Sequence, residues 1–535
     1  MYKQVLDPIA HSLGWSSLVA VLPLIALFIL LGGVRMKAQW ASLLALGVAL
    51  VVAIAVYGMP VGQAADAALL GAVFGFFPIM WIVINALWIY NMTAETGHFT
   101  TLRRAFSTVS SDQRIQVIVI AFCFGALLEA LAGFGTPVAI CGVMLVGLGF
   151  SPIKSAAVAL VADTAPVAFG AIAIPITTLA QTSGLAKHDL SSMVGRQTPF
   201  LALLVPFVLV FIAGGRRGLR ETWPAALVAG LSFAVVQFLS SNYISPELTD
   251  ILASLASAGV LIAFLRVWTP GGAAPRVATG PRPAIAGGST SDPAFERRIG
   301  EGGDDGPRGT RATLTALAPY AIIILVLGLT NLHGVQAELE KTTRAFSWPG
   351  LQVLSSKGKV SPSETFKFNW LTAAGTGLLV CGLLSAAALR LHPRRALAVY
   401  GRTLAGLRWP ILTVCSVLAL AYVMNLSGQT ITLGTWAAGA GAAFAFLASF
   451  IGWFGVAVTG SDTASNSLFG ALQVTAAKQS GLSPVLMAAA NSSGGVLAKM
   501  VSPQNLAIGA AAVGLGGREG DIFRRVIGWS CSSCW

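Results

Sequence analysis

The sequence predicts an all-α membrane protein whose chain crosses a lipid bilayer many times. Of its 535 residues, 55% are hydrophobic and only 10% are charged, and the mean hydropathy is +0.76. Soluble domains carry about a quarter charged residues, so this chain must use lipid as its solvent over much of its surface. The formal net charge of +13 does not indicate a nucleic-acid partner, because the basic residues stand in short clusters between apolar runs.

Apolar runs of about 18 residues or more are long enough to cross the bilayer as helices. Nine such runs are predicted, at 15–33, 40–57, 68–90, 198–214, 224–242, 249–266, 313–332, 369–391 and 410–426. Two further apolar regions, 115–183 and 444–517, are interrupted by Gly, Pro and polar residues. Together these segments predict about 11–12 spanning helices.

Basic clusters between the runs predict the orientation, because Lys and Arg are retained on the cytoplasmic side. The clusters are Arg35/Lys37, Arg103/Arg104/Arg114, Arg216/Arg217/Arg220, Arg266, Arg394/Arg395 and Arg518/Arg524/Arg525. If all of them are cytoplasmic, the N-terminus lies outside. It then follows that segment 115–150 enters the membrane from the cytoplasm and returns to it. Segment 444–480 enters from the outside and returns there, so two re-entrant hairpins of opposite orientation are predicted.

A Gly-, Pro- and charge-rich segment, 270–311, divides the chain and is predicted to be a disordered cytoplasmic linker. The first membrane half, 1–269, holds hairpin 115–150 and a broken helix at 153–183. The second half, 312–535, begins with a polar outer loop at 333–367 and holds hairpin 444–480 and a broken helix at 484–517. Its short final apolar run suggests a chain truncated before a last helix.

The two interrupted regions share an order of elements: a hairpin, a Ser-Pro pair and a broken helix. Glu129 in the first hairpin tip precedes Pro152 by 23 residues, and Asp462 in the second precedes Pro484 by 22. With the opposite orientations, this order is typical of an inverted-repeat transporter. Non-helical backbone is tolerated at membrane depth only inside protein or around a cavity, so the breaks predict a binding site.

Lys499 is the strongest single candidate for binding an anionic substrate, because a charge in an otherwise neutral membrane segment is costly. The alternative is a structural lysine paired with Asp462 or Glu129. Half-helix N-termini beside it would also suit a carboxylate. Glu129, Asp163 and Asp462 are candidate proton carriers, with helix capping or a fixed ion pair as the alternative.

Small polar groups at the tips and breaks are candidate ligands for the rest of a small hydroxy acid. They are Ser461, Thr463, Asn466, Asn491, Ser492 and Gln504, together with Gly133, Gly135 and Thr136 of the first tip. The alternative is that they join helices. For Arg196, an anchor at the membrane interface is the preferred interpretation. The chain has no phosphate-binding loop, metal-spaced His/Cys cluster or nucleophile elbow, so no catalytic residue, cofactor or metal is predicted.

Several of these stretches also resemble the L-lactate permease family over nearly the whole chain. The resemblance lies in Phe122–Ala139, Thr164–Ala171, Val194–Gln197, Glu221–Pro224, Thr459–Asn466 and Lys499–Gln504. It implies uptake of L-lactate, D-lactate and glycolate by proton symport in the bacterial cytoplasmic membrane, through an elevator-type cycle. One departure is Asp163, where better-known members carry Asn, so this site holds an additional titratable group.

Two other functions remain open from the sequence. A sodium-coupled carboxylate carrier is one, because polar tips such as Ser461-Asp462-Thr463 also suit Na⁺. A membrane-embedded lactate sensor is the other, with the 270–311 linker as its only support. The ranking of lactate, glycolate and pyruvate is undetermined, and a homodimer is left open.

Overall fold

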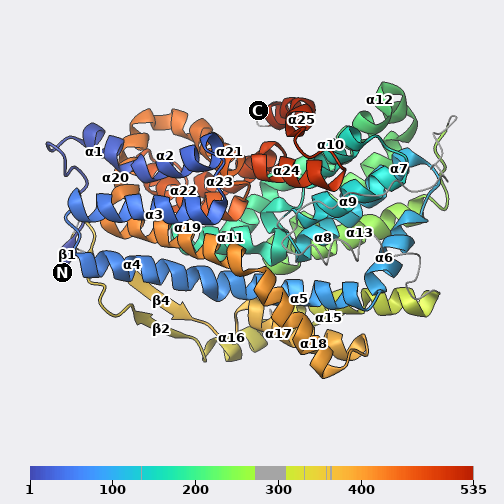
Figure 1. Cartoon of the computed structure of the whole chain (residues 1–535), viewed down its shortest axis with the longest axis horizontal. Coiled ribbons are helices and arrows are strands. Elements are labelled where there is room, and N and C mark those ends of the chain that lie inside the picture. The colour runs from blue at the N-terminus through green and yellow to red at the C-terminus, as the bar shows by residue number, and fades with distance from the viewer. Residues whose placement is uncertain are drawn as a thin grey trace.

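The computed structural model describes residues 1–533 except 134, 272–308, 331, 357, 359, 362 and 363. It is an elongated bundle of helices, many of which run along its long axis (Figure 1). Nearly all of the predicted linker, from 272 to 308, lies outside the described residues.

Nine helical segments in the described part of the chain are long and apolar enough to cross a membrane. They are Leu13–Gly33, Ala38–Ala55, Val61–Glu95, Gln113–Leu131, Lys187–Tyr243, Pro246–Phe264, Thr310–Thr330, Arg408–Ser427 and Gln429–Thr459. A tenth candidate is a bent pair, Pro152–Ala162 with Val167–Ser183. The all-α membrane fold is therefore as predicted.

Three of the predicted runs differ from the structure in their limits. The runs 198–214 and 224–242 belong to one 57-residue helix, α12 (Lys187–Tyr243), which kinks where Gly215 adopts φ 65°. The run 369–391 contains α17 (Ala374–Ala388), which has only 15 residues. Apolar composition locates these runs correctly. The two runs in α12 are joined by continuous helix because the residues between them, Arg216–Trp223, have as high a helix propensity as the runs themselves.

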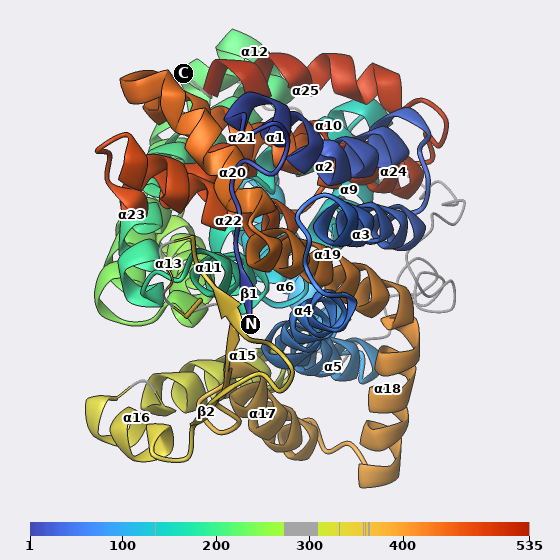
Figure 2. The same ribbon diagram turned by 90° about the vertical axis from the view of Figure 1, so that its left-hand side faces the viewer.

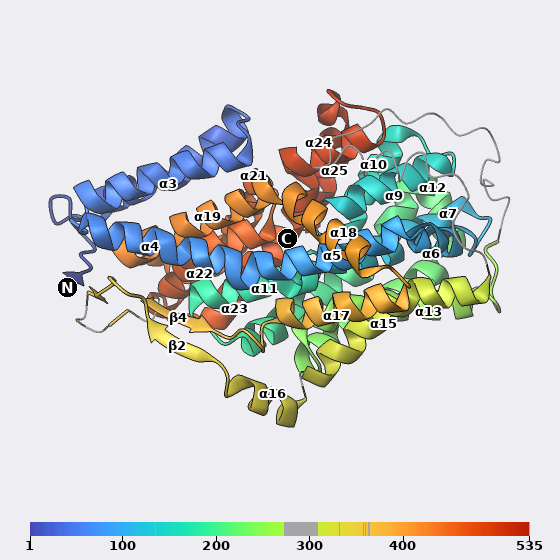
Figure 3. The same ribbon diagram turned by 60° about the horizontal axis from the view of Figure 1, so that its bottom comes forward.

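The first helices pack closely against α19 (Arg408–Ser427), which lies beside both α3 (Ala38–Ala55) and α4 (Val61–Phe74) (Figure 1). A Cβ atom on Gly71 of α4 would lie 2.5 Å from the Leu418 carbonyl oxygen, so only glycine permits this approach. Figure 3 shows α5 (Trp81–Glu95) continuing from α4 along one side of the molecule, through the π-helical turn η2 (Gly75–Met80). The segments before α3 are α1 (Leu13–Ala20), α2 (Leu22–Phe28) and η1 (Ile29–Gly33).

Two small β-sheets lie at the end of the molecule that holds the N-terminus (Figure 2). Strand β1 (Tyr2–Lys3) pairs in parallel with β3 (Val353–Leu354), and β2 (Arg344–Ser347) pairs antiparallel with β4 (Thr365–Phe368). The predicted loop 333–367 thus contains strands and α16 (His333–Glu340). Sequence reasoning missed the strands because they have only two to four residues, too few to show an alternating pattern.

Each of the two interrupted regions contains a helical hairpin followed by a broken helix. The first hairpin has one arm made of α7 (Gln113–Val117), η3 (Ile118–Phe124) and α8 (Gly125–Leu131), and α9 (Thr136–Gly147) packs back against it. The second pairs α21 (Phe444–Thr459) with α22 (Asp462–Gln479). Each second arm follows a glycine with positive φ, Gly135 at 80° and Gly460 at 74°.

The broken helices follow directly. In the first region, α10 (Pro152–Ala162) and the segment made of η4 (Val167–Phe169) and α11 (Gly170–Ser183) meet at a 61° bend. In the second, α23 (Pro484–Ala498) gives way to a single 3-10 turn, η8 (Lys499–Val501), before α24 (Pro503–Ala512). The remaining elements are α6 (His98–Ser107), η5 (Pro246–Leu248), α13 (Thr249–Phe264), α15 (Thr310–Thr330), α18 (Pro393–Gly406), α20 (Gln429–Ala437), η7 (Ala438–Ala443) and α25 (Glu519–Ser533).

Candidate functional site

A buried lysine lies between two buried carboxyl groups where the two interrupted regions meet. The Nζ atom of Lys499 lies 2.6 Å from Glu129 Oε1 and 2.9 Å from Asp163 Oδ2, and each of the three side chains is at most 7% exposed. Lys499 comes from η8, Glu129 from α8 and Asp163 from the end of α10. The pairing with Glu129 is one form of the structural ion pair that the sequence analysis considered as the alternative role of Lys499. Asp462 forms no ion pair with Lys499 in the described structure.

The local backbone explains how these groups come together. Asp163 and Lys499 both stand where a helix stops, at the ends of α10 and α23. Gly170, at the start of α11, faces Glu129 so closely that a Cβ atom there would lie 2.8 Å from Oε1. The next three residues, Ala171–Ala173, all have positive φ between 45° and 59°, which is costly for non-glycine residues. Such strain is concentrated at functional sites in proteins.

This cluster has spare bonding capacity and an unbalanced charge. An ammonium group offers three donors, of which one donates to Glu129 Oε1. Asp163 Oδ2 forms an ion pair at 2.9 Å but no hydrogen bond within the described part of the chain. Glu129 Oε2 and Asp163 Oδ1 have no hydrogen-bond partner among the residues described. If both acids are ionised, the three groups together carry one net negative charge. The cluster can therefore accept a proton, and it can bind an anion only when negative charge is removed.

Asp462 belongs to a second polar cluster, on the first turn of α22. Its Oδ2 atom accepts hydrogen bonds from Ser492 Oγ at 2.6 Å and from Asn466 Nδ2 at 3.3 Å. Its Oδ1 atom has no partner among the described residues, and a Cβ atom on Gly495 would lie 2.7 Å from it. Asp462 is therefore a buried carboxyl group held by neutral donors.

The predicted amide groups extend this cluster toward the first broken helix. Asn491 Nδ2 donates to Asn466 Oδ1 at 2.9 Å, and Gln473 Nε2 donates to Asn491 Oδ1 at 3.1 Å. Asn466 Nδ2 also lies 3.2 Å from the Pro175 carbonyl oxygen in α11. These hydrogen bonds join Asn466, Asn491 and Ser492 to each other and to α11. In the structure these side chains therefore connect helices, which is the alternative to substrate binding considered for them above.

The two hairpin tips meet at Asn505, a residue that the sequence did not single out. Its Nδ2 atom donates to the Gly460 carbonyl oxygen at 3.1 Å, and its Oδ1 atom lies 3.3 Å from where a Cβ atom of Gly135 would stand. Ser502 caps α24 through the Asn505 backbone N–H. The Ser-Pro-x-Asn spacing that positions Asn505 was the available signal, since a helix N-cap with an amide three residues later is recognisable in a sequence.

The other predicted residues lie around the tips. Gln504 is exposed, with Oε1 2.9 Å from where a Gly460 Cβ atom would stand, and Ser461 caps α22. Thr463 and Thr136 are half-buried, whereas Gly133 is buried near Ala171. No hydrogen bond recorded in the described part of the chain joins this set to Lys499, and the exposed Arg196 contacts Asn242 instead.

Another buried acid, Asp250, also escaped the sequence analysis. It stands on the first turn of α13, 1% exposed, and its Oδ1 atom accepts a hydrogen bond from Gln237 Nε2 at 3.3 Å. Its helix packs against α8, the helix that carries Glu129. This burial was not predicted, because Asp250 stands at the edge of a predicted span, where an acid normally faces water.

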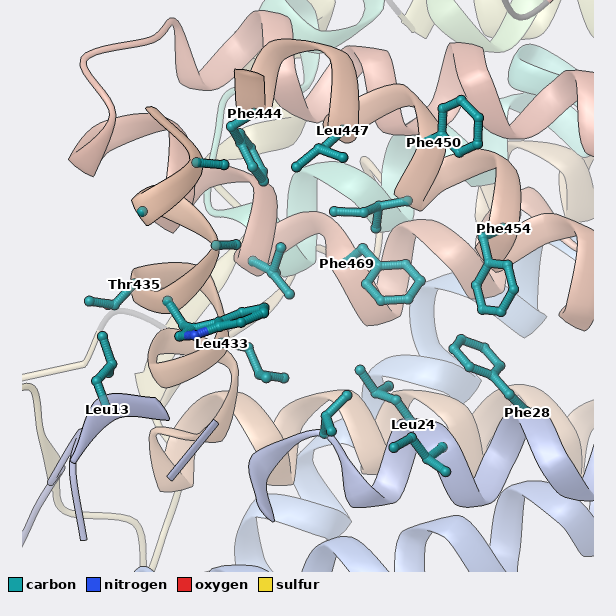
Figure 4. Close-up of a pocket in the computed structure, with 18 residues that line it drawn as sticks. Leu13, Leu24, Phe28, Leu433, Thr435, Phe444, Leu447, Phe450, Phe454 and Phe469 are labelled. Atoms are coloured by element: carbon teal, nitrogen blue, oxygen red, sulfur yellow. The ribbon is translucent and has the colours of Figure 1, made fainter. Parts of the chain in front are cut away.

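A large cavity in the described structure lies away from these charges. It has a volume of about 950 Å³ and is bounded by α1, α2, α20, α21 and α22 (Figure 4). Its wall is formed by groups such as Leu24, Phe28, Phe444, Phe454 and Phe469, and no charged side chain lines it. A carboxylate would lose its hydration there without compensation, so this cavity is unsuited to an organic anion.

Comparison with known proteins gives consistent results over the whole length. The family model for L-lactate permease matches residues 16–532. The chain is 41% identical to the glycolate permease of Escherichia coli K12, covering 96% of this chain and 93% of that protein. It is also 41% identical to the L-lactate permeases of Escherichia coli K12 and Bacillus subtilis, covering 98% of this chain and 94% and 95% of theirs.

A solved structure, the YdaH transporter of Alcanivorax borkumensis, aligns with 77% of this chain and 85% of its own at 16% identity, with a TM-score of 0.31. The family model and the permease relatives, in contrast, extend across nearly all of the sequence. This chain belongs to the L-lactate permease family.

Proposed function

We propose that this protein takes up L-lactate and related short 2-hydroxy monocarboxylates, such as D-lactate and glycolate, together with protons. The observation that carries the proposal is Lys499, a buried cation held by Glu129 and Asp163. The permease relatives named for L-lactate and for glycolate support this substrate class. Family membership indicates a transporter rather than an enzyme.

Coupling follows from competition for Lys499. With Glu129 and Asp163 ionised, their charges hold the ammonium group and repel an incoming anion. A proton on either acid weakens its contact with Lys499, and the freed ammonium can then bind the substrate carboxylate. Proton binding therefore favours anion binding, and by thermodynamic linkage the bound anion favours protonation to the same degree.

Neutral groups near the tips are available for the rest of the substrate. The N-termini of α9 and α24 begin beside Asn505, and helix N-termini favour an anion. Ser461, Thr463, Thr136 and Gln504 offer hydroxyl and amide groups for the 2-hydroxyl. We assign Asp462 as a further proton carrier, because its carboxyl group is buried without a cationic partner in the described structure.

The transport cycle that we propose is of the elevator type. Both interrupted regions have the same order of elements. The approach of Asn505 to Gly135 and the Lys499 cluster connect one region to the other. A unit tied together in this way can move as one body and carry its site across the membrane. In this proposal the two regions are inverted repeats, the N-terminus lies outside, and the protein resides in the bacterial cytoplasmic membrane.

The test is uptake of radiolabelled L-lactate into vesicles that contain the purified protein. An inward pH gradient imposed in sodium-free buffer should drive accumulation, and a protonophore should abolish it. Counterflow of labelled against unlabelled L-lactate should persist without any gradient. Accumulation that strictly requires sodium would favour the sodium-coupled alternative, whereas binding without counterflow would favour a sensor.

A further inference from the structure

The buried carboxyl group of Asp250 has no role in the function described above. Its side chain is 1% exposed, and its Oδ2 atom has no hydrogen-bond partner among the described residues. No lysine, arginine or histidine in the described structure forms an ion pair with it. An ionised carboxylate without a cationic partner is very costly inside a protein, so this site suits a carboxyl group that binds a proton.

The groups around Asp250 are few and mostly neutral. Its helix, α13, packs against α12, α8, η3 and α11. From α12 the contact is the Gln237 amide. Helix α8 carries the acid Glu129, and η3 carries Cys123, whose thiol lies 3.4 Å from Ser257 Oγ, further along α13. Segment α11 contains no titratable side chain. Glu129, the acid carried by α8, is the one that pairs with Lys499.

Gln237 fixes the position of this acid relative to the first broken helix. Its Nε2 atom donates to Asp250 Oδ1 and to the Ala165 carbonyl oxygen, each at 3.3 Å. Its Oε1 atom accepts a hydrogen bond from Thr198 at 3.4 Å. Because Ala165 lies in the break that begins at Asp163, Gln237 links Asp250 to the same backbone turn that carries the Lys499 cluster.

A small cavity lies one helical turn before Asp250. Glu247, three residues earlier in the 3-10 turn η5 that leads into α13, lines a cavity of about 50 Å³ with Thr330, Gln336 and Thr372. This volume holds at least one water molecule, and the lining offers several polar partners for it. Glu247 also pairs with Lys187, whose side chain is 34% exposed, so this end of α13 is near solvent.

We infer that Asp250 is a proton relay between the cavity at Glu247 and Glu129 in the substrate site. This inference rests on the proposed proton symport and adds the route by which the proton reaches the substrate site. A proton that enters through water at Glu247 binds Asp250 and passes to Glu129, where it releases Lys499 for the substrate carboxylate. No bond other than O–H is formed or broken, and Asp250 is ready for the next proton.

The test compares two assays on Asp250→Asn, which keeps the side-chain shape and can still hydrogen bond to Gln237. Accumulation of L-lactate driven by an inward pH gradient should fall about ten-fold, a typical coupling effect. Counterflow at equal pH, which requires no net proton entry, should stay close to wild type. The conservative variant Asp250→Glu should recover accumulation. A pH-sensitive dye inside the vesicles should show slower lactate-dependent acidification in Asp250→Asn.

The outcomes are separable from those of the proposed function. A wild-type protein with neither counterflow nor gradient-driven uptake would refute the transport proposal itself. If wild type transports and Asp250→Asn accumulates lactate normally, the relay is wrong. Loss of both assays in Asp250→Asn, with the purified variant still folded, would also overturn it, because Asp250 would then serve exchange rather than proton movement. Asp189→Asn, an exposed acid on α12, is the matched control and should behave as wild type.

Discussion

Lys499 Nζ lies 2.6 Å from Glu129 Oε1, although the two residues are 370 positions apart in the chain. This contact joins the break of the second region to the hairpin of the first. Both side chains are buried, so salt in the solvent screens this ion pair little. Removing either side chain would leave the other as an unpaired buried charge, which is strongly destabilising. The predictions below follow from this arrangement and from its supports.

Lys499→Ala should abolish measurable lactate binding. Removing a buried cation from a charge pair costs about 2 kcal/mol or more, which corresponds to a loss of about 30-fold or more in affinity. Isotope binding to the purified protein measures the loss. The exposed Lys478, near the end of α22, provides the control, and Lys478→Ala should bind normally. Unchanged affinity in Lys499→Ala would remove Lys499 from the carboxylate-binding role.

Asp163→Asn and Glu129→Gln should each make lactate binding less sensitive to pH. In the wild type, lowering the pH protonates an acid beside Lys499 and frees the ammonium group, so the KM for lactate should rise as the pH rises. A neutral amide at either position removes one of the competing charges permanently, so the KM should change less with pH. Counterflow measured across a range of equal internal and external pH tests this. An equally steep pH profile in both variants, with Glu338→Gln as the exposed control, would contradict the competition mechanism.

Gly170→Ala should destabilise the protein through its contact with Glu129. The added Cβ atom would lie 2.8 Å from Oε1, and overpacking of this kind costs about 1–3 kcal/mol. A lower melting temperature of the detergent-purified variant should report it. Gly259→Ala is the matched change, since Gly259 lies in α13 with nothing within 4 Å of an added Cβ, and it should stabilise the helix by about 0.5–1 kcal/mol.

Arg114→Met should destabilise the base of the first hairpin. Arg114 is buried, its Nη2 atom lies 2.8 Å from Asp112 Oδ2, and Nη1 pairs with Glu221 of α12. Truncating one partner of a buried ion pair costs about 3–5 kcal/mol, because the remaining charges lose compensation. Thermal unfolding measures the shift. Arg216→Met, at an exposed position of the same α12 kink, should leave the melting temperature nearly unchanged, and equal effects of the two variants would refute a specific role for Arg114.

The positions where helices stop could be read from the sequence because glycine and proline have local effects. Gly135 and Gly460 adopt the positive φ that allows each hairpin to turn, and Pro503 begins α24 just after the 3-10 turn that carries Lys499. Length and apolar composition were likewise enough to predict most of the long helices. These signals depend only on neighbouring residues, which is why they can be recognised without a structure.

The identity of contacts across the fold could not be read in this way. Nothing near Lys499 in the sequence shows that Asp163 would be its second partner rather than Asp462. Asp250 was missed because a carboxyl group at the edge of an apolar run is ordinary, and it is buried only when α13 packs against its neighbours, among them α12 and α8. Asn505 connects the two hairpin tips because it lies beside Gly135 and Gly460, which are distant from each other in the chain. In each case the information lies in packing between segments.

The acids of the buried cluster are synthesised long before the lysine that pairs with them. Glu129 and Asp163 leave the ribosome 370 and 336 residues before Lys499, which at ordinary elongation rates is on the order of tens of seconds. During that interval the nascent first half contains two acids destined for the membrane interior and lacks their counter-ion. Because an unpaired charge inside the membrane is costly, these two acids must be neutral or hydrated until η8 brings Lys499 to them.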